Sequence, residues 1–270
     1  MKNYNFLIAG TIRNCERTLF KTIKCLDNVF LEAKKFEYFL VESDSSDKSL
    51  VELEKLNKRT NFSYISLGKL KKELPIRTER LAFCRNKYID LIFNDSNYQW
   101  VDYLVIVDFD GVCTSLKPGD FYSCWQYQNW DVFTANTSDI YYDIWALRHN
   151  NWSPNDCWQN KKDLVQIGFN KKTSEEISIN SRMIKINPNS EIIKVDSAFG
   201  GLAIYRKNSI PRQAHYQGQL NKIEICEHVF FNKFITSNGG EIFINPKLVI
   251  GEALFEHKKV QINYLGFLKK

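Results

Sequence analysis

The chain has 270 residues, of which 44% are apolar and 25% are charged, and its formal net charge is +6. This balance excludes an intrinsically disordered chain, which would have fewer apolar residues and a larger charge imbalance. Lysine and arginine form no block of five or more, so the charge pattern does not indicate a nucleic-acid partner. No stretch approaches the roughly 20 apolar residues of a membrane span.

The seven cysteines are scattered and odd in number, and no Cys-x-x-Cys pair occurs. This favours reduced thiols over a disulfide framework or a zinc cluster. Residues 1–6 contain no long apolar run and no small-residue cleavage site, so no signal peptide is expected. We therefore expect a cytoplasmic protein. The basic stretch 264–270 is a candidate for contact with the inner face of a membrane.

The first 115 residues predict a regular alternation of strands and helices. The expected elements are a strand over 4–9, a helix over 18–30, a strand over 36–41, a helix over 50–56, a strand over 62–67, a helix over 77–93 and a strand over 103–107. The strands are short apolar runs, and the helices have apolar residues at helical spacing. Such an alternation indicates an α/β fold with a mostly parallel central sheet flanked by helices, and a Rossmann-like front half.

The pattern after residue 115 is less regular. Residues 119–165 contain five of the six tryptophans and indicate a region that faces a ligand. Beyond it we expect a hairpin over 177–195, a strand over 202–205, a helix over 223–236 and a strand over 241–249. No internal repeat or low-complexity linker divides the chain, so we predict a single domain over 1–270.

Two carboxylates follow the last strand of the front half. The apolar run 103–107 leads directly into Asp108-Phe109-Asp110-Gly111. Ligands of open α/β sheets bind at the carboxyl ends of the parallel strands. A carboxylate pair at that edge suits a hard divalent cation, which prefers oxygen ligands and can bridge to phosphates. The alternative is a solvated turn, since a chain of this length contains about one Asp-x-Asp by chance.

The segment 107–112 resembles the motif of the haloacid-dehalogenase-like phosphatases. That resemblance implies a phosphatase or phosphotransferase in which Asp108 is the nucleophile and Asp110 a general acid and base. Those enzymes usually carry the motif in their first strand, and an acidic pair follows a later strand. Neither later strand predicted here is followed by such a pair, so the phosphatase is the alternative hypothesis.

Five segments, the Asp-x-Asp among them, together resemble glycosyltransferases of the GT-A fold. In chain order they are the Ser/Asp-rich turn 41–47, the helix start 77–86, the Asp-x-Asp at 108–110, the Gly-rich strand 199–206 and the acidic residue in 226–228. The segment 141–148 and Phe199-Gly200-Gly201 bring the pattern nearest to the capsule mannosyltransferase-like branch. The resemblance covers residues 4 to 257 and implies a GT-A-like fold.

The same resemblance implies the activity. It is a metal-dependent glycosyltransferase, in the hexosyltransferase class, which moves a sugar from a nucleoside-diphosphate sugar to a glycan or glycolipid such as a surface polysaccharide. UDP is favoured over GDP as the nucleotide. Residues up to about 115 would bind the nucleotide sugar, and residues from about 116 would bind the acceptor. A third hypothesis is a nucleotide- or glycan-binding protein that retains the fold without turnover.

The resemblance also implies roles for individual residues. The metal, Mn²⁺ or Mg²⁺, would be held by Asp108, Asp110 and His257. Contacts to the nucleotide sugar are implied for Thr11, Arg13, Glu42, Asp44, Arg85, Asp108, Gly200 and Gly201. The catalytic residues would be Glu227 and Asp110, and the acceptor or sugar pocket would contain Asp143, Trp145, Arg148 and His228. The chain departs from the pattern at His228, where a second acid is expected, and this leaves the base and the stereochemistry open.

Several of these residues also have an ordinary structural interpretation. Asp44 lies among residue types that favour turns and helix N-caps. Glu227 would be stabilised by the helix dipole in the first turn of a helix. Trp145 has a spacing that is also typical of core aromatic residues, and His257 is also compatible with a surface position. These alternatives remain open at the level of the sequence.

Overall fold

The computed structural model describes residues 3–254. Its main strands are β1 (Asn5–Ile12), β2 (Lys35–Glu42), β3 (Phe62–Ser66), β4 (Tyr103–Val107), β5 (Val132–Asn136), β6 (Ile193–Val195), β7 (Leu202–Arg206) and β10 (Ile242–Val249). They form one sheet in the order β3-β2-β1-β4-β7-β5-β10-β6. Six strands run in one direction, while β7 and β6 are antiparallel to their neighbours. The mostly parallel sheet is therefore confirmed.

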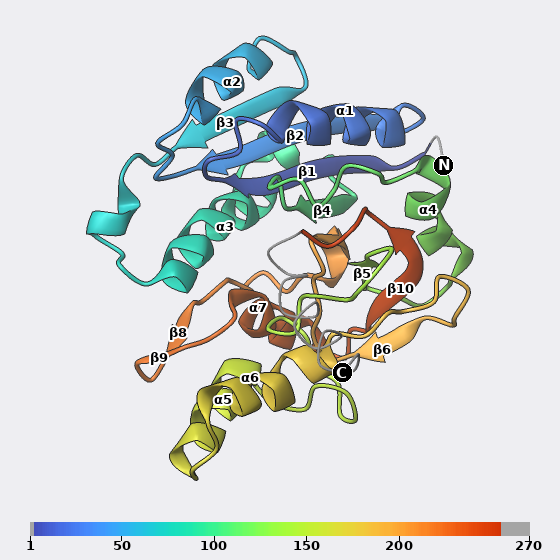
Figure 1. Cartoon of the computed structure of the whole chain (residues 1–270). Helices are drawn as coiled ribbons and strands as arrows, with labels where there is room; N and C mark the ends of the chain where they lie inside the picture. The colour runs from blue at the N-terminus through green and yellow to red at the C-terminus, as the bar shows by residue number, and fades with distance from the viewer. Residues whose placement is uncertain (1–2, 255–270) are drawn as a thin grey trace.

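Helices cover both faces of this sheet. The α-helices of the described residues are α1 (Leu19–Phe30), α2 (Ser49–Leu56), α3 (Arg77–Asn94), α4 (Pro118–Tyr122), α5 (Cys157–Gln166), α6 (Lys171–Ser178) and α7 (Glu227–Ser237). Figure 1 shows α1 and α2 on one side of the sheet and α3 and α7 on the other. In β4, Leu104 and Ile106 join the apolar layer under α3 and α7, whereas Val105 joins the layer under α1. Burial on both faces explains why this strand is a continuous apolar run.

The front half follows the predicted pattern. All seven elements expected before residue 115 are present, and their ends differ from the predicted ends by at most three residues. The buried residues of α1 include Leu19, Ile23, Leu26 and Phe30, which form one stripe at helical spacing. Hydrophobic periodicity is a sufficient signal here because every element has one or two faces in a continuous core.

The back half differs from the prediction in several places. The hairpin expected over 177–195 is wrong, because α6 extends to Ser178 and only Ile193–Val195 forms a strand. Asn170 explains the start of α6, since its side chain accepts a hydrogen bond from the backbone N–H of Thr173. The helix expected from residue 223 begins at Glu227 instead. A small hairpin of β8 (Gln219–Leu220) and β9 (Ile223–Glu224) precedes it.

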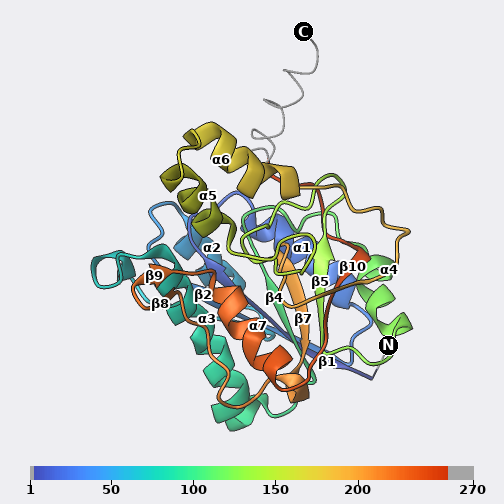
Figure 2. The same ribbon diagram turned by 90° about the horizontal axis from the view of Figure 1, so that it is seen from below.

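The sheet contains strands from both halves of the chain, because β4 of the front half pairs with β7 of the back half. By contrast, α5 and α6 lie together at a distance from the sheet (Figures 1 and 2). No helix between residues 3 and 254 is long and apolar enough to cross a membrane. All seven cysteines are free.

Candidate active site

A cleft of about 520 Å³ opens where β1, β2 and β4 end. The front wall consists of residues at the ends of these strands or directly after them, together with the first turns of α3. The back wall consists of the loop 142–145, the first residues of α5 and the first residues of α7. Ten of the predicted site residues line it: Thr11, Arg13, Asp44, Arg85, Asp108, Asp110, Asp143, Trp145, Glu227 and His228. The topology thus brings together residues that are more than 200 positions apart in the sequence.

The carboxylate pair is at the centre of the front wall. The backbone N–H of Asp108 bonds the carbonyl of Gly201 at 2.9 Å, and Oδ1 of Asp110 accepts a hydrogen bond from Val112 N at 3.1 Å. Desolvation in the cleft, followed by repulsion from Asp110, raises the pKa of Asp108 to about 8. The pair therefore holds less negative charge near neutral pH than two free carboxylates would, and a bound cation would relieve the repulsion.

The pair also suits a divalent cation by its chemistry. No group of three or more His, Cys, Asp or Glu side chains in the described part of the chain forms a complete metal cage. Mg²⁺ in nucleotide enzymes usually binds to one or two carboxylates and to substrate phosphates, so such a cage is not required. The two carboxylates fit this open type of site. The third predicted ligand, His257, lies outside the described residues.

Arg85 connects the two walls of the cleft. It lies on α3, and only 3% of its surface is exposed. Its Nε donates to Oε1 of Glu227 at 3.1 Å, and its Nη2 lies 3.7 Å from Oδ1 of Asp108. Its Nη1 also donates to the hydroxyl of Tyr88 at 3.1 Å. The buried guanidinium therefore fixes one carboxylate of each wall; its predicted contact with the nucleotide stays a prediction.

The turn after β2 contains two of the predicted acidic residues in different roles. Glu42 is buried and does not line the cleft; its carboxylate accepts hydrogen bonds from Ser45 N at 2.9 Å and from the hydroxyl of Ser66 at 2.5 Å. Asp44 lines the cleft and has a positive φ of 60°. Its Oδ1 accepts a hydrogen bond from Lys71 N at 3.0 Å. Glu42 thus holds the turn that presents Asp44.

The two predicted glycines support different walls: Gly200 bonds Asp143 of the back wall, and the carbonyl of Gly201 accepts from Asp108 of the front wall. Gly200 and Gly201 have φ values of +68° and +88°, which favour glycine. A Cβ at Gly200 would lie 2.6 Å from the carbonyl oxygen of Ala135. The N–H of Gly200 donates to Oδ2 of Asp143 at 3.0 Å. Neither glycine lines the cleft, but Gly200 orients a carboxylate that does.

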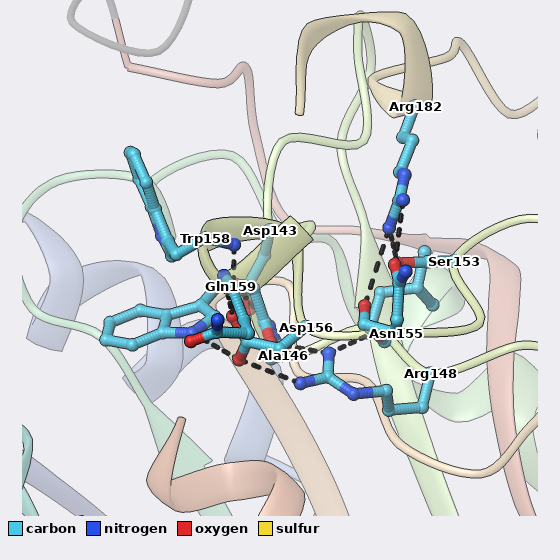
Figure 3. A network of polar contacts seen from close by, with 11 residues as sticks. Asp143, Ala146, Arg148, Ser153, Asn155, Asp156, Trp158, Gln159 and Arg182 are labelled. Atoms are coloured by element: carbon cyan, nitrogen blue, oxygen red, sulfur yellow. Dashed lines mark hydrogen bonds and ion pairs between the residues drawn. The ribbon is translucent and has the colours of Figure 1, made fainter. Parts of the chain in front are cut away.

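Asp156 organises the rest of the back wall. Its Oδ1 accepts the N–H groups of Trp158 and Gln159 and so caps α5. Its Oδ2 accepts from Nε1 of Trp145 at 2.9 Å and from Nη2 of Arg148 at 3.0 Å. Figure 3 shows the guanidinium of Arg148 directed at this carboxylate. Trp145 is therefore held against the cleft, whereas Arg148 does not line it.

Several residues that line the cleft were not predicted from the sequence. Arg77, Arg80 and Cys84 line the cleft from α3 together with Arg85, although Arg80 and Arg85 lie five residues apart and project at different angles from the helix. Nη1 of Arg80 donates to the carbonyls of Leu74 and Pro75. Trp158 lines the cleft from α5, a helix that was not predicted. Only the general richness of this region in tryptophan pointed towards it.

Comparison with known proteins supports the fold. No protein-family model matches the chain, and no curated protein matches it. Among solved structures, S. aureus TarS 1-349 in complex with UDP-GlcNAc matches 94% of this chain with a TM-score of 0.54 at 12% sequence identity. S. aureus TarS matches 97% of this chain with the same TM-score and identity. This chain covers 60% of the first of those chains and 40% of the second. The likeness shows the α/β fold of the GT-A class.

Proposed function

We propose that the chain is a metal-dependent glycosyltransferase of the hexosyltransferase class. Its donor would be a nucleoside-diphosphate sugar, with UDP favoured over GDP, and its acceptor a glycan or glycolipid such as a surface polysaccharide. The observation that carries this proposal is the Asp108–Asp110 pair at the end of β4, which faces a cleft in a chain with the GT-A fold. A structural neighbour that is solved with UDP-GlcNAc supports a nucleotide-sugar donor.

In this proposal Asp108 and Asp110 hold Mn²⁺ or Mg²⁺. When bound, the cation neutralises the charge that develops on the departing diphosphate. Thr11, Arg13 and Asp44 line the same wall, and we assign them to the nucleotide. The front half up to about residue 115 would then bind the donor, and the rest of a single domain would bind the acceptor.

We assign Glu227 as the catalytic base. It is the first residue of α7, it lines the cleft, and it is 4% exposed. Oε1 accepts the hydrogen bond from Arg85, so Oε2 is the atom assigned to take a proton from the acceptor hydroxyl. Asp143, which is held by Gly200, and Trp145, which is held by Asp156, would shape the sugar pocket beside it.

The fold does not favour the phosphatase hypothesis. Asp108 follows the fourth strand along the chain rather than the first, and no acidic pair follows β7 or β10. A binding protein without turnover has no separate observation in its favour. A cytoplasmic location and membrane contact through 264–270, which lie outside the described residues, follow from the sequence prediction and form part of the proposal.

An activity assay tests the proposal. UDP-glucose, UDP-galactose, UDP-GlcNAc and GDP-mannose would each be incubated with Mn²⁺, with Mg²⁺ or with a chelator, and release of the nucleoside diphosphate would be measured. We expect metal-dependent release from at least one donor. The variant Asp110→Asn should lower the rate by about 10²–10³-fold, because one electrostatic element of the transition state is lost.

The control is Asp163→Asn, which changes an exposed aspartate of α5 outside the cleft and should retain full activity. An Asp110→Asn enzyme of unchanged rate would contradict the proposal. Phosphate release from small phosphate esters, with beryllofluoride trapped at Asp108, would favour the phosphatase instead.

A further inference from the structure

His228 is a buried imidazole in the wall of the cleft. It is the second residue of α7, it is 3% exposed, and it lines the cleft next to Glu227. Its ring stacks on Phe199, with ring centroids 3.9 Å apart and an interplanar angle of 18°. The ring of Tyr216 meets it edge-on at 5.6 Å. Aromatic packing therefore fixes the plane of the imidazole.

Neither ring nitrogen of His228 has a hydrogen-bond partner among the described residues. The more exposed His149 differs, since its Nδ1 accepts hydrogen bonds from the backbone of Asn151 and Trp152. Nδ1 of His215 lies 3.0 Å from the carbonyl of Gln213. Buried polar atoms are nearly always paired, so two unpaired nitrogens on one buried ring that lines a cleft indicate that a ligand group pairs at least one of them.

The charge state of this ring limits the kind of ligand. Burial, and then the positive charge of Arg85, lower the pKa of His228 well below its usual value. The imidazole is therefore neutral near pH 7, with one N–H donor and one acceptor nitrogen. A hydroxyl group both donates and accepts, and matches this ring. A phosphate offers acceptors only and would be bound better by the neighbouring arginine.

The position of the ring indicates that the donor sugar supplies this hydroxyl. Its neighbour Glu227 pairs with Arg85, and Arg85 in turn lies 3.7 Å from Asp108. These contacts connect His228 to the carboxylate pair that would hold the diphosphate. The donor sugar is bonded directly to that diphosphate, so it would extend into this part of the cleft.

We propose that His228 binds a hydroxyl group of the donor sugar and makes the cleft bind the sugar nucleotide more tightly than the bare nucleotide. This inference rests on the proposed function. It assigns a specificity-determining role to a residue that stands where the glycosyltransferase pattern has an acid. A neutral imidazole would select for a hydroxyl at one position of the sugar ring, because a donor without it leaves the ring nitrogen that would bind it unpaired.

The experiment compares binding of UDP, GDP and the four sugar nucleotides named above by titration calorimetry in Mn²⁺. The variants are His228→Phe, which keeps the stacking on Phe199 but has no ring nitrogens, and His228→Gln, which keeps hydrogen-bonding groups. The control is His215→Phe, which makes the same change in an exposed ring outside the cleft. Thermal unfolding of each ligand-free variant measures whether it folds.

We expect wild type to bind one sugar nucleotide more tightly than its bare nucleotide. His228→Phe should weaken binding of that sugar nucleotide about tenfold while changing the Kd of the bare nucleotide by less than about twofold. His228→Gln should recover part of the loss, and His215→Phe should behave as wild type. The ligand-free His228→Phe protein should unfold at an equal or higher temperature, because an unpaired polar ring is removed.

Three results would overturn the inference. The first is an equal loss of affinity in His228→Phe for the sugar nucleotide and the bare nucleotide. The second is no loss of affinity for either. The third is a wild type that binds no sugar nucleotide more tightly than its bare nucleotide. A wild-type protein that binds no nucleotide at all contradicts the proposed function itself, and this outcome is visible before any variant is tested.

Discussion

The two walls of the cleft are built on different principles. The front wall contains residues that follow β1, β2 and β4, and neighbouring parallel strands end at the same edge by topology. The back wall depends on single polar contacts, chiefly those of Asp143 and Asp156. The front wall is therefore as stable as the sheet, while the back wall can be altered by one substitution without loss of the fold.

Arg85 joins the two walls, because it pairs with a carboxylate of each. A substitution there should therefore have the largest effect on stability. Arg85→Ala leaves Glu227 buried without its partner. We expect the free energy of unfolding to fall by about 3–5 kcal/mol, measured by urea denaturation. Arg77→Ala, an exposed change on the same helix, should alter it by less than about 0.5 kcal/mol. Equal effects of the two variants would show that Arg85 does not join the walls.

Gly200 tests how closely the back wall is packed against the sheet. In Gly200→Ala the new Cβ would lie 2.6 Å from the carbonyl of Ala135, at a φ of +68°. Backbone strain of about 1 kcal/mol and a steric clash of about 1–3 kcal/mol should add. The matched control is Gly239→Ala, which has a φ of +81° but no atom within 4 Å of the new Cβ.

The difference in unfolding free energy between these two variants isolates the clash from the strain. A Gly200→Ala protein no less stable than the Gly239→Ala protein would mean that the backbone at Gly200 has room to move. Because Gly200 orients Asp143, we also expect the Gly200 variant alone to lower the rate of sugar transfer.

A substitution at Asp156 tests whether the back wall can be altered with only a small loss of stability. Asp156→Ala removes the cap of α5 and the partner of Trp145 and Arg148. We expect a loss of about 0.5–2 kcal/mol in unfolding free energy, with a raised KM for the donor or acceptor. Asn170→Ala removes the cap of α6 in the same way but does not touch the cleft. It should have a similar effect on stability and none on KM; a KM change in both variants would indicate that α5 and α6 act on the cleft together.

The sequence predicted the front wall because local signals suffice there. A five-residue apolar run ending in two carboxylates places Asp108 and Asp110 at the sheet edge without knowledge of distant contacts. The helix predicted over 77–93 carries Arg85 to the cleft, but the resemblance, and not the local pattern, implied its contact with the nucleotide. The resemblance to known glycosyltransferases, rather than the local pattern, identified Glu227 and His228 in the back wall.

The remainder depends on tertiary contacts that no local pattern reveals. Strand β5 was missed because it includes polar Thr134 and Asn136, both fully buried. The side chain of Asn136 donates to the carbonyls of Ile186 and Pro246, residues at least 50 positions away. Asp156 looks like an ordinary turn residue until its partners are known. Buried polar residues whose hydrogen-bond partners are distant in the sequence give a segment the composition of a loop, so the sequence pattern does not reveal the strand.

The proposal that Asp108 and Asp110 hold a metal which binds the nucleotide is tested most directly by calorimetric titration. UDP would be titrated into wild type and Asp110→Asn, each in Mn²⁺ and in chelator. The same titration with GDP covers the other nucleotide. We expect wild type to bind one of these nucleotides in Mn²⁺, and chelator or the Asp110→Asn change to weaken binding about tenfold or more. Nucleotide binding of equal strength with and without metal, and with and without the Asp110 carboxylate, would contradict it.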